Sequence, residues 1–332
     1  MKALLFAGTV AVSALCGSSA LAWHNQGHQM TAAIAWKTMH APARCRAAQL
    51  LQTAKIYSQP ITGAGAPAAD EALFVSAATW PDRIKEMKPP YNDDGEVPKG
   101  AKASQNIGSA DMWLHKYWHY VDYPVPDDPT KPPPSVNAEE RIELFTSKLA
   151  AADTSDDLKA YDLAWLIHLV GDVHQPLHAA TQYSQAFVTP KHPLAKDDGG
   201  NGVPLKWADT QKAPNPHKVP YNLHAYWDAA PGDGSDIIAA IAAADALPPP
   251  AEDQAKIADP KLWVTESHLL ADTKVYVAPV VRGSAQPVLL DDTYLQAAAG
   301  ITQVRIALGG VRLGRLLDAT LTGPSPGCPA PS

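Results

Sequence analysis

The sequence predicts a mainly α-helical protein with a single domain, and three observations support this fold class. Apolar residues recur at helical spacing along much of the chain, segments of alternating polarity are few, and neither a Gly/Ser linker nor an internal repeat divides the 332 residues. A chain of this length can bury one large core. We therefore expect a single-domain multi-helix bundle with long surface loops.

Helical periodicity marks seven segments, which are 26–40, 42–57, 138–152, 157–175, 224–244, 250–271 and 291–318. The helix at 138–152 has a defined start, because Ser135 or Asn137 can act as its N-cap and two glutamates follow near the positive end of the helix dipole. Alternation is convincing in few places, and Thr273–Val281 is the best candidate for a short strand.

Three proline-containing segments are predicted to lie outside the helices. The stretches 123–135 and 191–220 are expected to be surface loops, and 323–332 a Pro-rich C-terminal tail that follows a domain at 23–322. Cys45 and Cys328 lie away from the other motifs of the chain, so they can form a disulfide or remain two free thiols.

The N-terminal 22 residues have the composition of a secretory signal peptide. One lysine precedes an apolar stretch from Ala3 to Leu15, and Ala20-Leu21-Ala22 matches an A-x-A cleavage site. A lipoprotein is disfavoured, because Leu15 precedes Cys16 where a lipobox requires a small residue. We expect a secreted or periplasmic protein without a membrane anchor, whose mature chain begins at Trp23.

The segment 165–178 places three histidines and an aspartate in an otherwise apolar stretch. Burying so many ionisable groups is costly unless they are paired or bind a metal. His168 and Asp172 are four residues apart and share a helix face, Pro176 ends the helix, and His178 follows in the next turn. Imidazole nitrogen and carboxylate oxygen are typical zinc ligands. The alternative is a helix whose polar groups are satisfied by hydrogen bonds.

A second pair repeats the His-x-x-x-Asp spacing. His224 and Asp228 share one face if their segment is helical. One such pair also fits an amphipathic helix with a histidine at the edge of the core. Two pairs together with His178 predict a metal-binding protein.

Seven motifs together resemble one family. They are the mature N-terminal Trp23, His28 five residues later, Trp80-Pro81-Asp82, His119-Tyr120-Val121-Asp122, the 168–178 run, Asp197-Asp198-Gly199-Gly200-Asn201, and His224 with Asp228. The set is similar to that of the zinc-dependent single-strand-specific nucleases of the S-one/P-one type, or nuclease/3′-nucleotidases. Bacterial zinc phospholipase C shares their fold.

The resemblance implies a cofactor of three zinc ions. The matching ligands are Asp82, His119, His168 and Asp172 for the first ion, His178, His224 and Asp228 for the second, and the Trp23 amine and carbonyl, His28 and Asp172 for the third. Asp172 would thus bridge two ions. His115, four residues before His119, could compete for the first ion, but the surroundings of His119 match the family pattern. His174 is expected in the surroundings of the site rather than among the ligands.

The resemblance also implies roles for residues beside the metals. Lys85 would stabilise the phosphate in the transition state, although a solvated surface lysine is the alternative. Asp122 would orient the attacking water or contact a base, and Tyr120 would stack on a base unless it only packs in the core. Asn201 lies in a loop whose glycines allow a close backbone approach near the site or simply permit a turn.

The implied activity is hydrolysis of single-stranded DNA and RNA to 5′-phosphorylated products by zinc-activated water, with 3′-nucleotidase activity. The formal net charge of −7 fits an enzyme that attracts one phosphate to a metal cluster better than one that tracks a long duplex through basic patches. The expected partners are these nucleic acids and 3′-nucleotides as substrates, with no stable protein partner and a monomeric chain.

Two alternative functions are considered. The first is a phosphodiesterase for lipid head groups, but the related phospholipases carry Glu where Asp228 stands here. The second is a non-catalytic periplasmic zinc-binding protein, which would need saturated metals and no phosphate cleft. Lys85 and Asp122 near the ligands argue against this second alternative.

Overall fold

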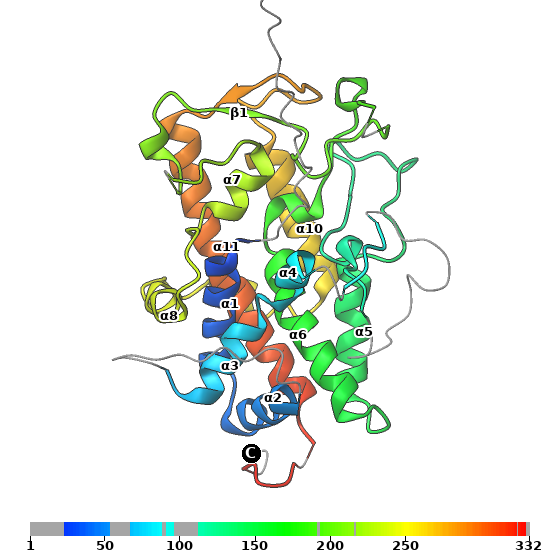
Figure 1. Cartoon of the computed structure of the whole chain (residues 1–332), viewed down its shortest axis with the longest axis vertical. Coiled ribbons are helices and arrows are strands. Elements are labelled where there is room, and N and C mark those ends of the chain that lie inside the picture. The colour runs from blue at the N-terminus through cyan, green and yellow to red at the C-terminus, as the bar shows by residue number, and fades with distance from the viewer. Residues whose placement is uncertain are drawn as a thin grey trace, which may run out of the picture.

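The computed structural model describes residues 23–53, 67–87, 91–95, 112–190, 193–215, 217–323 and 325–329. The predicted signal peptide lies outside these residues. The described chain is mostly helical and forms a single domain, which confirms the predicted fold class (Figure 1). Its α-helices are α1 (Asn25–Thr38), α2 (Ala41–Thr53), α3 (Ala69–Ala77), α4 (Trp80–Arg83), α5 (Ala138–Ala150), α6 (Asp156–Asp172), α7 (Leu223–Ala229), α8 (Ile237–Asp245), α9 (Glu252–Ala255), α10 (Pro260–Leu270) and α11 (Asp292–Thr320).

Other regular structure is limited to short pieces. The strands β1 (Leu205–Lys206) and β2 (Val288–Leu289) pair in parallel, with Leu205 opposite Val288. Turns of 3-10 helix occur at Ile84–Glu86, Lys116–Trp118, Pro176–Ala179, Gln185–Phe187 and Thr210–Lys212. The small sheet joins two loop segments at the end of the molecule where β1 is labelled in Figure 1.

Helix α6 lies in the interior of the bundle. Ser155 caps its exposed start by accepting a hydrogen bond from the Leu158 N–H, and every residue from Ala160 to Asp172 is buried. A helix that is apolar all round belongs in the interior of a protein, and α2, α5 and α11 pack around α6. The helix therefore carries its last turn, and the polar groups on it, into the middle of the molecule.

Helices α1 and α11 lie side by side (Figure 1). Two glycines of α11 permit this close approach. A Cβ at Gly310 would lie 2.5 Å from the Ile34 Cβ, and one at Gly314 would lie 2.6 Å from the Thr38 Cβ. Larger residues at these positions would push the helices apart. Helix α1 also contacts α6, so the N-terminal segment reaches the end of α6.

Two predicted helices are each divided by a local breaker. The segment 224–244 forms α7 and α8, because Pro231 and Gly232 interrupt it and Gly232 has a φ of 116°. The segment 250–271 forms α9 and α10, with Pro260 in the first turn of α10. Proline suits that position because its missing N–H would have no helical partner there. Apolar residues recur at helical spacing on both sides of each break, so each pair of helices was predicted as a single helix.

The predicted strand at Thr273–Val281 is wrong. Ala271–Val275 continues α10 as a turn of π-helix, and the Thr273 hydroxyl donates to the Leu269 carbonyl as it would in a helix. The predicted cap of α5 is found at Asn137, whose side chain accepts from the Glu140 N–H over 3.1 Å. Helices α3 and α4 lie outside the segments for which helical periodicity predicted a helix.

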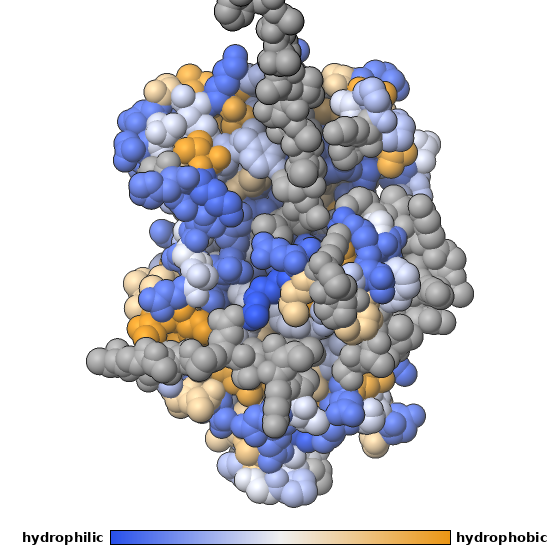
Figure 2. All heavy atoms as spheres, in the orientation of Figure 1, coloured by the Kyte–Doolittle hydropathy of each residue, from blue (hydrophilic) through white to orange (hydrophobic). Residues whose placement is uncertain are grey.

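A disulfide joins Cys45 of α2 to Cys328 near the C-terminus and spans 283 residues of sequence. Of the two possibilities left open by the sequence, the bridged form is the one present. Among the helices in the described ranges, none is long and apolar enough to cross a membrane. On the face drawn in Figure 2, hydrophilic residues gather near the middle of the molecule.

Candidate metal centre

The end of α6 and the turn after it bring His168, Asp172 and His178 to one buried place. All three side chains are fully buried. The Gln175 side chain accepts a hydrogen bond from the Leu177 N–H and so caps the 3-10 turn that begins at Pro176. This turn reverses the chain after α6 and presents His178 toward the helix that it has just left.

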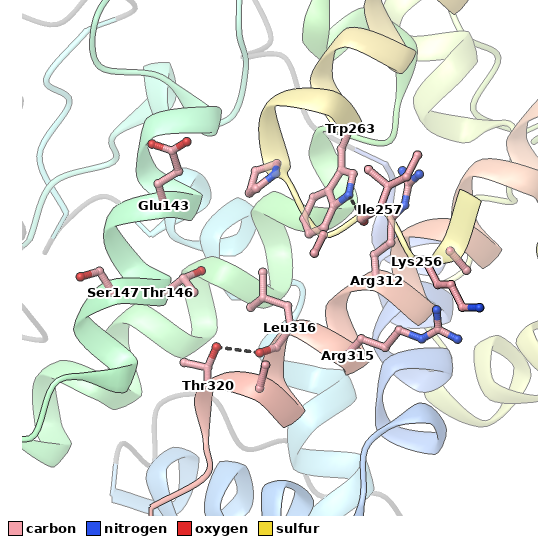
Figure 3. Close-up of a pocket in the computed structure, with 14 residues that line it drawn as sticks. Glu143, Thr146, Ser147, Lys256, Ile257, Trp263, Arg312, Arg315, Leu316 and Thr320 are labelled. Atoms are coloured by element: carbon pink, nitrogen blue, oxygen red, sulfur yellow. Dashed lines mark hydrogen bonds between the residues drawn. The ribbon is translucent and has the colours of Figure 1, made fainter. Parts of the chain in front are cut away.

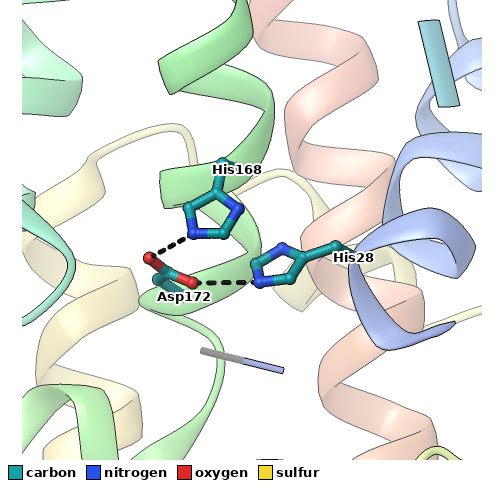
Figure 4. Close-up of side chains that lie close together, drawn as sticks. All are labelled: His28, His168 and Asp172. Atoms are coloured by element: carbon teal, nitrogen blue, oxygen red, sulfur yellow. Dashed lines mark ion pairs between the residues drawn. The ribbon is translucent and has the colours of Figure 1, made fainter. Parts of the chain in front are cut away.

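Asp172 lies at the centre of the first group of polar side chains. Its Oδ2 is 3.0 Å from His119 Nδ1 and 3.2 Å from His168 Nε2. Its Oδ1 is 3.3 Å from His28 Nε2, so both carboxylate oxygens face histidines (Figure 4). Asp82, from α4, completes the group with Oδ1 3.7 Å from His168 Nε2.

A second group is formed by side chains of α7 and of the turn after α6. His224 Nε2 is 3.3 Å from Asp228 Oδ2, and His178 Nε2 is 3.7 Å from Asp228 Oδ1. Gln175 donates from Nε2 to Asp228 Oδ1 over 2.7 Å. This hydrogen bond fixes the carboxylate in the orientation that faces the two imidazoles.

Three histidines share one hydrogen-bonding pattern. Each has its Nδ1 close to a backbone carbonyl, with distances of 2.7 Å for His168 to Ala78, 2.7 Å for His178 to His119 and 2.8 Å for His224 to Gly199. A carbonyl only accepts, so each Nδ1 carries a proton, and each Nε2 faces the centre of its group, where it can bind a metal in its deprotonated form. Such a bond to the second nitrogen is typical of metal-binding histidines.

The described residues fit a metal at three places. Ligand atoms lie within 4.8 Å of one another in each of three sets, which are His28, His168 and Asp172; Asp82, His119 and His168; and His178, His224 and Asp228. Buried atoms of four of these residues have no hydrogen-bond partner among the described residues: His28 Nε2, His119 Nε2, Asp172 Oδ1 and His178 Nε2. Leaving such atoms unsatisfied is costly, and cations would satisfy them together. Nitrogen and oxygen donors without thiolate suit zinc.

Burial and neighbouring charges shift the proton affinities in this centre. Burial, together with the positive charge of Lys85, lowers the pKa of His119 to about 3. Burial also disfavours the charged form of His178, but the nearby carboxylates of Asp228 and Asp172 raise its pKa to about 9. A cation that binds at His178 Nε2 would therefore displace a proton. The pKa of Asp172 is held well below its usual range, because the surrounding histidines outweigh its burial. The carboxylate at the centre is therefore charged at neutral pH.

Trp23 packs beside the first group. Its side chain is fully buried, and a Cβ placed on Gly171 would lie 2.8 Å from His28 Nδ1 and 3.8 Å from Trp23 Cδ1. The next residue, His24, donates its N–H to the Asp228 carbonyl over 2.9 Å. The backbone at 23–24 is thus tied to both groups, and in the full-length chain the Trp23 nitrogen is a peptide amide.

Lys85 follows α4 and reaches the same centre. Its Nζ lies 2.8 Å from Asp82 Oδ1, and its side chain is buried rather than solvated at the surface. A buried ammonium group beside a candidate metal ligand can interact with an anion that approaches this centre.

Asp122 is held next to the second group by a backbone pairing. The Val121 N–H donates to the His178 carbonyl over 2.6 Å. The Asp122 carboxylate accepts from Lys196 Nζ over 2.6 Å, and the same ammonium lies 5.9 Å from the ring centre of Tyr120. Tyr120 is partly buried and packs against the core.

The loop 197–201 supports His224 through its backbone. Gly199 provides the carbonyl that fixes the imidazole. Its φ is 63°, and a Cβ there would lie 2.5 Å from the Leu177 carbonyl oxygen, so only glycine fits. The Asn201 Nδ2 donates to the Asp198 carbonyl over 2.8 Å, and its Oδ1 accepts from Asn222 Nδ2 over 3.2 Å. Asn201 therefore links the loop to the N-cap of α7.

The structure places His115 and His174 outside the three sets. His115 has Nδ1 2.9 Å from Asp94 Oδ2 and stacks on Trp118, so His119 and not His115 lies with Asp82.

Two residues that support the centre, Gln175 and Lys196, were not predicted from the sequence. The position of Gln175 between the candidate ligands Asp172 and His178 could have indicated its role. Nothing in the sequence around Lys196 connects it to Asp122.

A separate cavity of about 480 Å³ lies between α5, α10 and α11 (Figure 3). Its apolar lining includes Trp263, Ile257 and Leu316, with Lys256 and Arg315 also among its lining residues. All of its lining residues lie outside the three ligand sets. The cavity is therefore distinct from the candidate metal centre.

Comparison with known proteins identifies the family. The family described as S1/P1 Nuclease matches residues 23–322. The chain belongs to the S1/P1 nuclease family. It is 26% identical to Endonuclease 2 of Arabidopsis thaliana over 187 residues, which cover 53% of this chain and 57% of that protein. It is 30% identical to Endonuclease 1 of the same plant over 91 residues, or 26% of this chain and 23% of the relative. These S1/P1 nuclease matches thus span less than two thirds of either relative.

Proposed function

We propose that this S1/P1 nuclease family member is an exported zinc-dependent phosphodiesterase with three zinc ions. It hydrolyses single-stranded DNA and RNA to 5′-phosphorylated products and removes the 3′-phosphate from nucleotides. The proposal depends mainly on the position of Asp172. One of its carboxylate oxygens faces His28, and the other faces His119 and His168. One carboxylate that faces two adjacent ligand sets suits a cluster of metals better than a single ion.

Each ion would have its own ligands. Asp82, His119, His168 and Asp172 would hold the first, His178, His224 and Asp228 the second, and His28, Asp172 and the Trp23 amine and carbonyl the third. When bound, zinc supplies a water of lowered pKa and offsets negative charge on the phosphate. Export would remove the signal peptide at 1–22 and free the Trp23 amine.

The remaining roles belong to side chains beside the ligands. The Lys85 ammonium would contact the phosphate oxygens and stabilise the charge that they gain in the transition state. Asp122 would accept a hydrogen bond from the attacking water or from a base. Tyr120 would stack on that base, and the loop 197–201 with Asn201 would form part of the wall beside it.

The recessed position of the ligands supports a preference for single strands. The metal-facing side chains are almost fully buried, so a phosphate must enter a recess to reach them. A flexible strand can bend its phosphate inward and turn a base onto an aromatic ring, whereas a duplex holds its bases stacked. The monomer would therefore act on short stretches of single strand and on mononucleotides.

The test uses the mature protein with its N-terminus verified as Trp23. Single-stranded DNA, RNA, 3′-AMP and phosphatidylcholine are incubated with it, with and without chelator and added zinc. We expect chelator-sensitive cleavage of both nucleic acids to 5′-phosphorylated ends and release of phosphate from 3′-AMP. The His178→Ala variant should be inactive, and His40→Ala, at an exposed histidine paired with Asp318, should be active. The proposed nuclease activity would be refuted if the protein hydrolysed only the lipid, or if the zinc-loaded protein hydrolysed none of these substrates.

A further inference from the structure

His174 lies between candidate ligands in sequence but faces away from them. It is fully buried, and its Nε2 is 3.0 Å from Arg312 Nη1. Because a guanidinium only donates, Nε2 is the acceptor and Nδ1 carries the proton, which it donates to the Val170 carbonyl over 2.7 Å. The imidazole is therefore a neutral link between the end of α6 and helix α11.

A pair of buried arginines forms the α11 side of this link. Arg305 and Arg312 are seven residues apart and point from the same face of the helix. Both contact Glu266 of α10: Arg305 Nη1 lies 2.8 Å and Arg312 Nη1 lies 2.7 Å from Glu266 Oε2. Two guanidinium groups thus share one carboxylate, which leaves an excess positive charge in the interior.

The excess charge is directed at the end of α6. Arg305 Nε donates to the His174 carbonyl over 3.2 Å, and the Ser267 hydroxyl, which accepts from Arg305 Nη2, donates to the Val173 carbonyl. Carbonyls at a helix C-terminus carry partial negative charge and lack helical partners. The network therefore satisfies the carbonyls between Asp172 and the turn that holds His178.

Packing restricts the same imidazole from two further sides. A Cβ at Gly309 of α11 would lie 3.2 Å from His174 Cγ, and the Trp263 ring centre lies 5.6 Å from that of His174. The ring is enclosed between two helices and has little freedom to rotate. On the far side, Trp263 and Arg312 line the cavity between α5 and α11 (Figure 3).

We propose that His174, Arg305 and Arg312 are positioning residues that clamp the turn 173–178 to α11 and so fix the separation of Asp172 from His178. This inference rests on the metal centre of the proposed function. The two ligands lie on opposite sides of the clamped turn, and each belongs to a different ligand set. Loosening the turn would change the geometry of the centre without removing any ligand.

The experiment measures metal binding rather than turnover. The Arg312→Met and His174→Leu variants are titrated with zinc against a chromophoric chelator, and with cobalt(II), whose visible spectrum reports ligand geometry. Removing groups that orient metal ligands typically weakens metal affinity by about 10- to 100-fold, and we expect a loss of this size with an altered cobalt spectrum. Arg315→Met is the matched control, because Arg315 lies on the same helix but pairs with Glu252 at the surface.

The His174→Gln variant separates a positioning role from a packing role and also serves if Arg312→Met does not fold. The glutamine amide oxygen can accept from Arg312, so Gln should restore most of the affinity that Leu loses. Wild-type zinc affinity and cobalt spectrum in folded Arg312→Met, or in both His174 variants, would overturn the inference. A wild-type protein that binds no zinc would instead refute the proposed metal centre itself.

Discussion

Lys196 Nζ donates to Asp122 Oδ2 over 2.6 Å and joins two segments that are 74 residues apart in the sequence. Burial raises the pKa of the Asp122 carboxyl above its usual value, and the nearby Lys196 ammonium opposes that rise. The contact keeps a carboxylate charged beside the second ligand set. Lys196 also pairs with Asp198, so the loop 197–201 and the segment 119–122 are held together.

Replacing Lys196 by Met should therefore weaken catalysis by raising the pKa of Asp122 further. Asp122 would then be protonated at a higher pH, so the acid limb of the kcat/KM profile should move to higher pH. Breaking a largely buried ion pair should also cost roughly 3 kcal/mol of folding free energy. Lys212→Met is the control, since Lys212 forms an exposed pair with Asp292. An unchanged acid limb in folded Lys196→Met would show that Asp122 does not depend on this lysine.

The sequence predicted the parts of the centre that come from local spacing. His168 with Asp172, and His224 with Asp228, lie four residues apart, so helix geometry alone places each pair on one face. The meeting of these pairs with Asp82 and His119 depended on the family resemblance. No periodicity connects α4, the 3-10 turn before His119 and the end of α6.

The features that were not predicted, or were predicted wrongly, have physical explanations. The contact of Lys196 with Asp122 depends on a loop path that composition does not encode. The segment 224–244 has apolar spacing on both sides of Pro231, but the polar and Gly-containing residues 231–236 separate the two halves into α7 and α8. In Thr273–Val281, the β-branched residues fit a strand, but the Thr273 hydroxyl bonds to a helical carbonyl and the helix continues.

The two carboxylates of the centre should differ in how many ions they control. Asp172 faces His28, His119 and His168, whereas Asp228 faces only the second set. We expect Asp172→Asn to lower the bound zinc by two ions per chain, and Asp228→Asn by one. Elemental analysis of the purified, dialysed proteins measures this directly. Equal losses in the two variants would argue against a bridging Asp172.

An uncleaved or extended N-terminus should prevent binding of one ion. In such a chain the Trp23 nitrogen is an amide without a lone pair for a metal, whereas the amine of a chain that begins at Trp23 has one. A protein with one additional Ala before Trp23 should bind one zinc fewer than the mature form and should have reduced activity. Its stability provides a second measurement, because a ligand present at 100 times its Kd stabilises the folded state by about 2.7 kcal/mol. Identical zinc content in both forms would remove Trp23 from the ligand set.

Asp197 should make the stability of the metal-free protein depend on pH. Its side chain is fully buried, although its carboxylate accepts from the Gln182 N–H over 2.8 Å and from the Thr181 hydroxyl over 3.1 Å. Burial outweighs these hydrogen bonds and raises its pKa from 3.8 to about 6. The folded chain therefore keeps a proton that the unfolded chain releases near pH 4. The resulting stabilisation is fully present below pH 4 and is lost as the pH rises through about 6.

The Asp197→Asn variant removes this titration, because the carboxamide resembles the protonated acid at every pH. Relative to the wild type, its free energy of unfolding should increase by roughly 3 kcal/mol between pH 4 and pH 7, because only the wild type loses stability as the carboxyl ionises. Urea unfolding of the metal-free proteins at several pH values measures the difference. Asp253→Asn, at an exposed position in α9, controls for the loss of one negative charge. A difference between Asp197→Asn and wild type that stays constant with pH would mean that the buried carboxyl is already ionised near pH 4. The hydrogen bonds to Asp197 would then outweigh its burial.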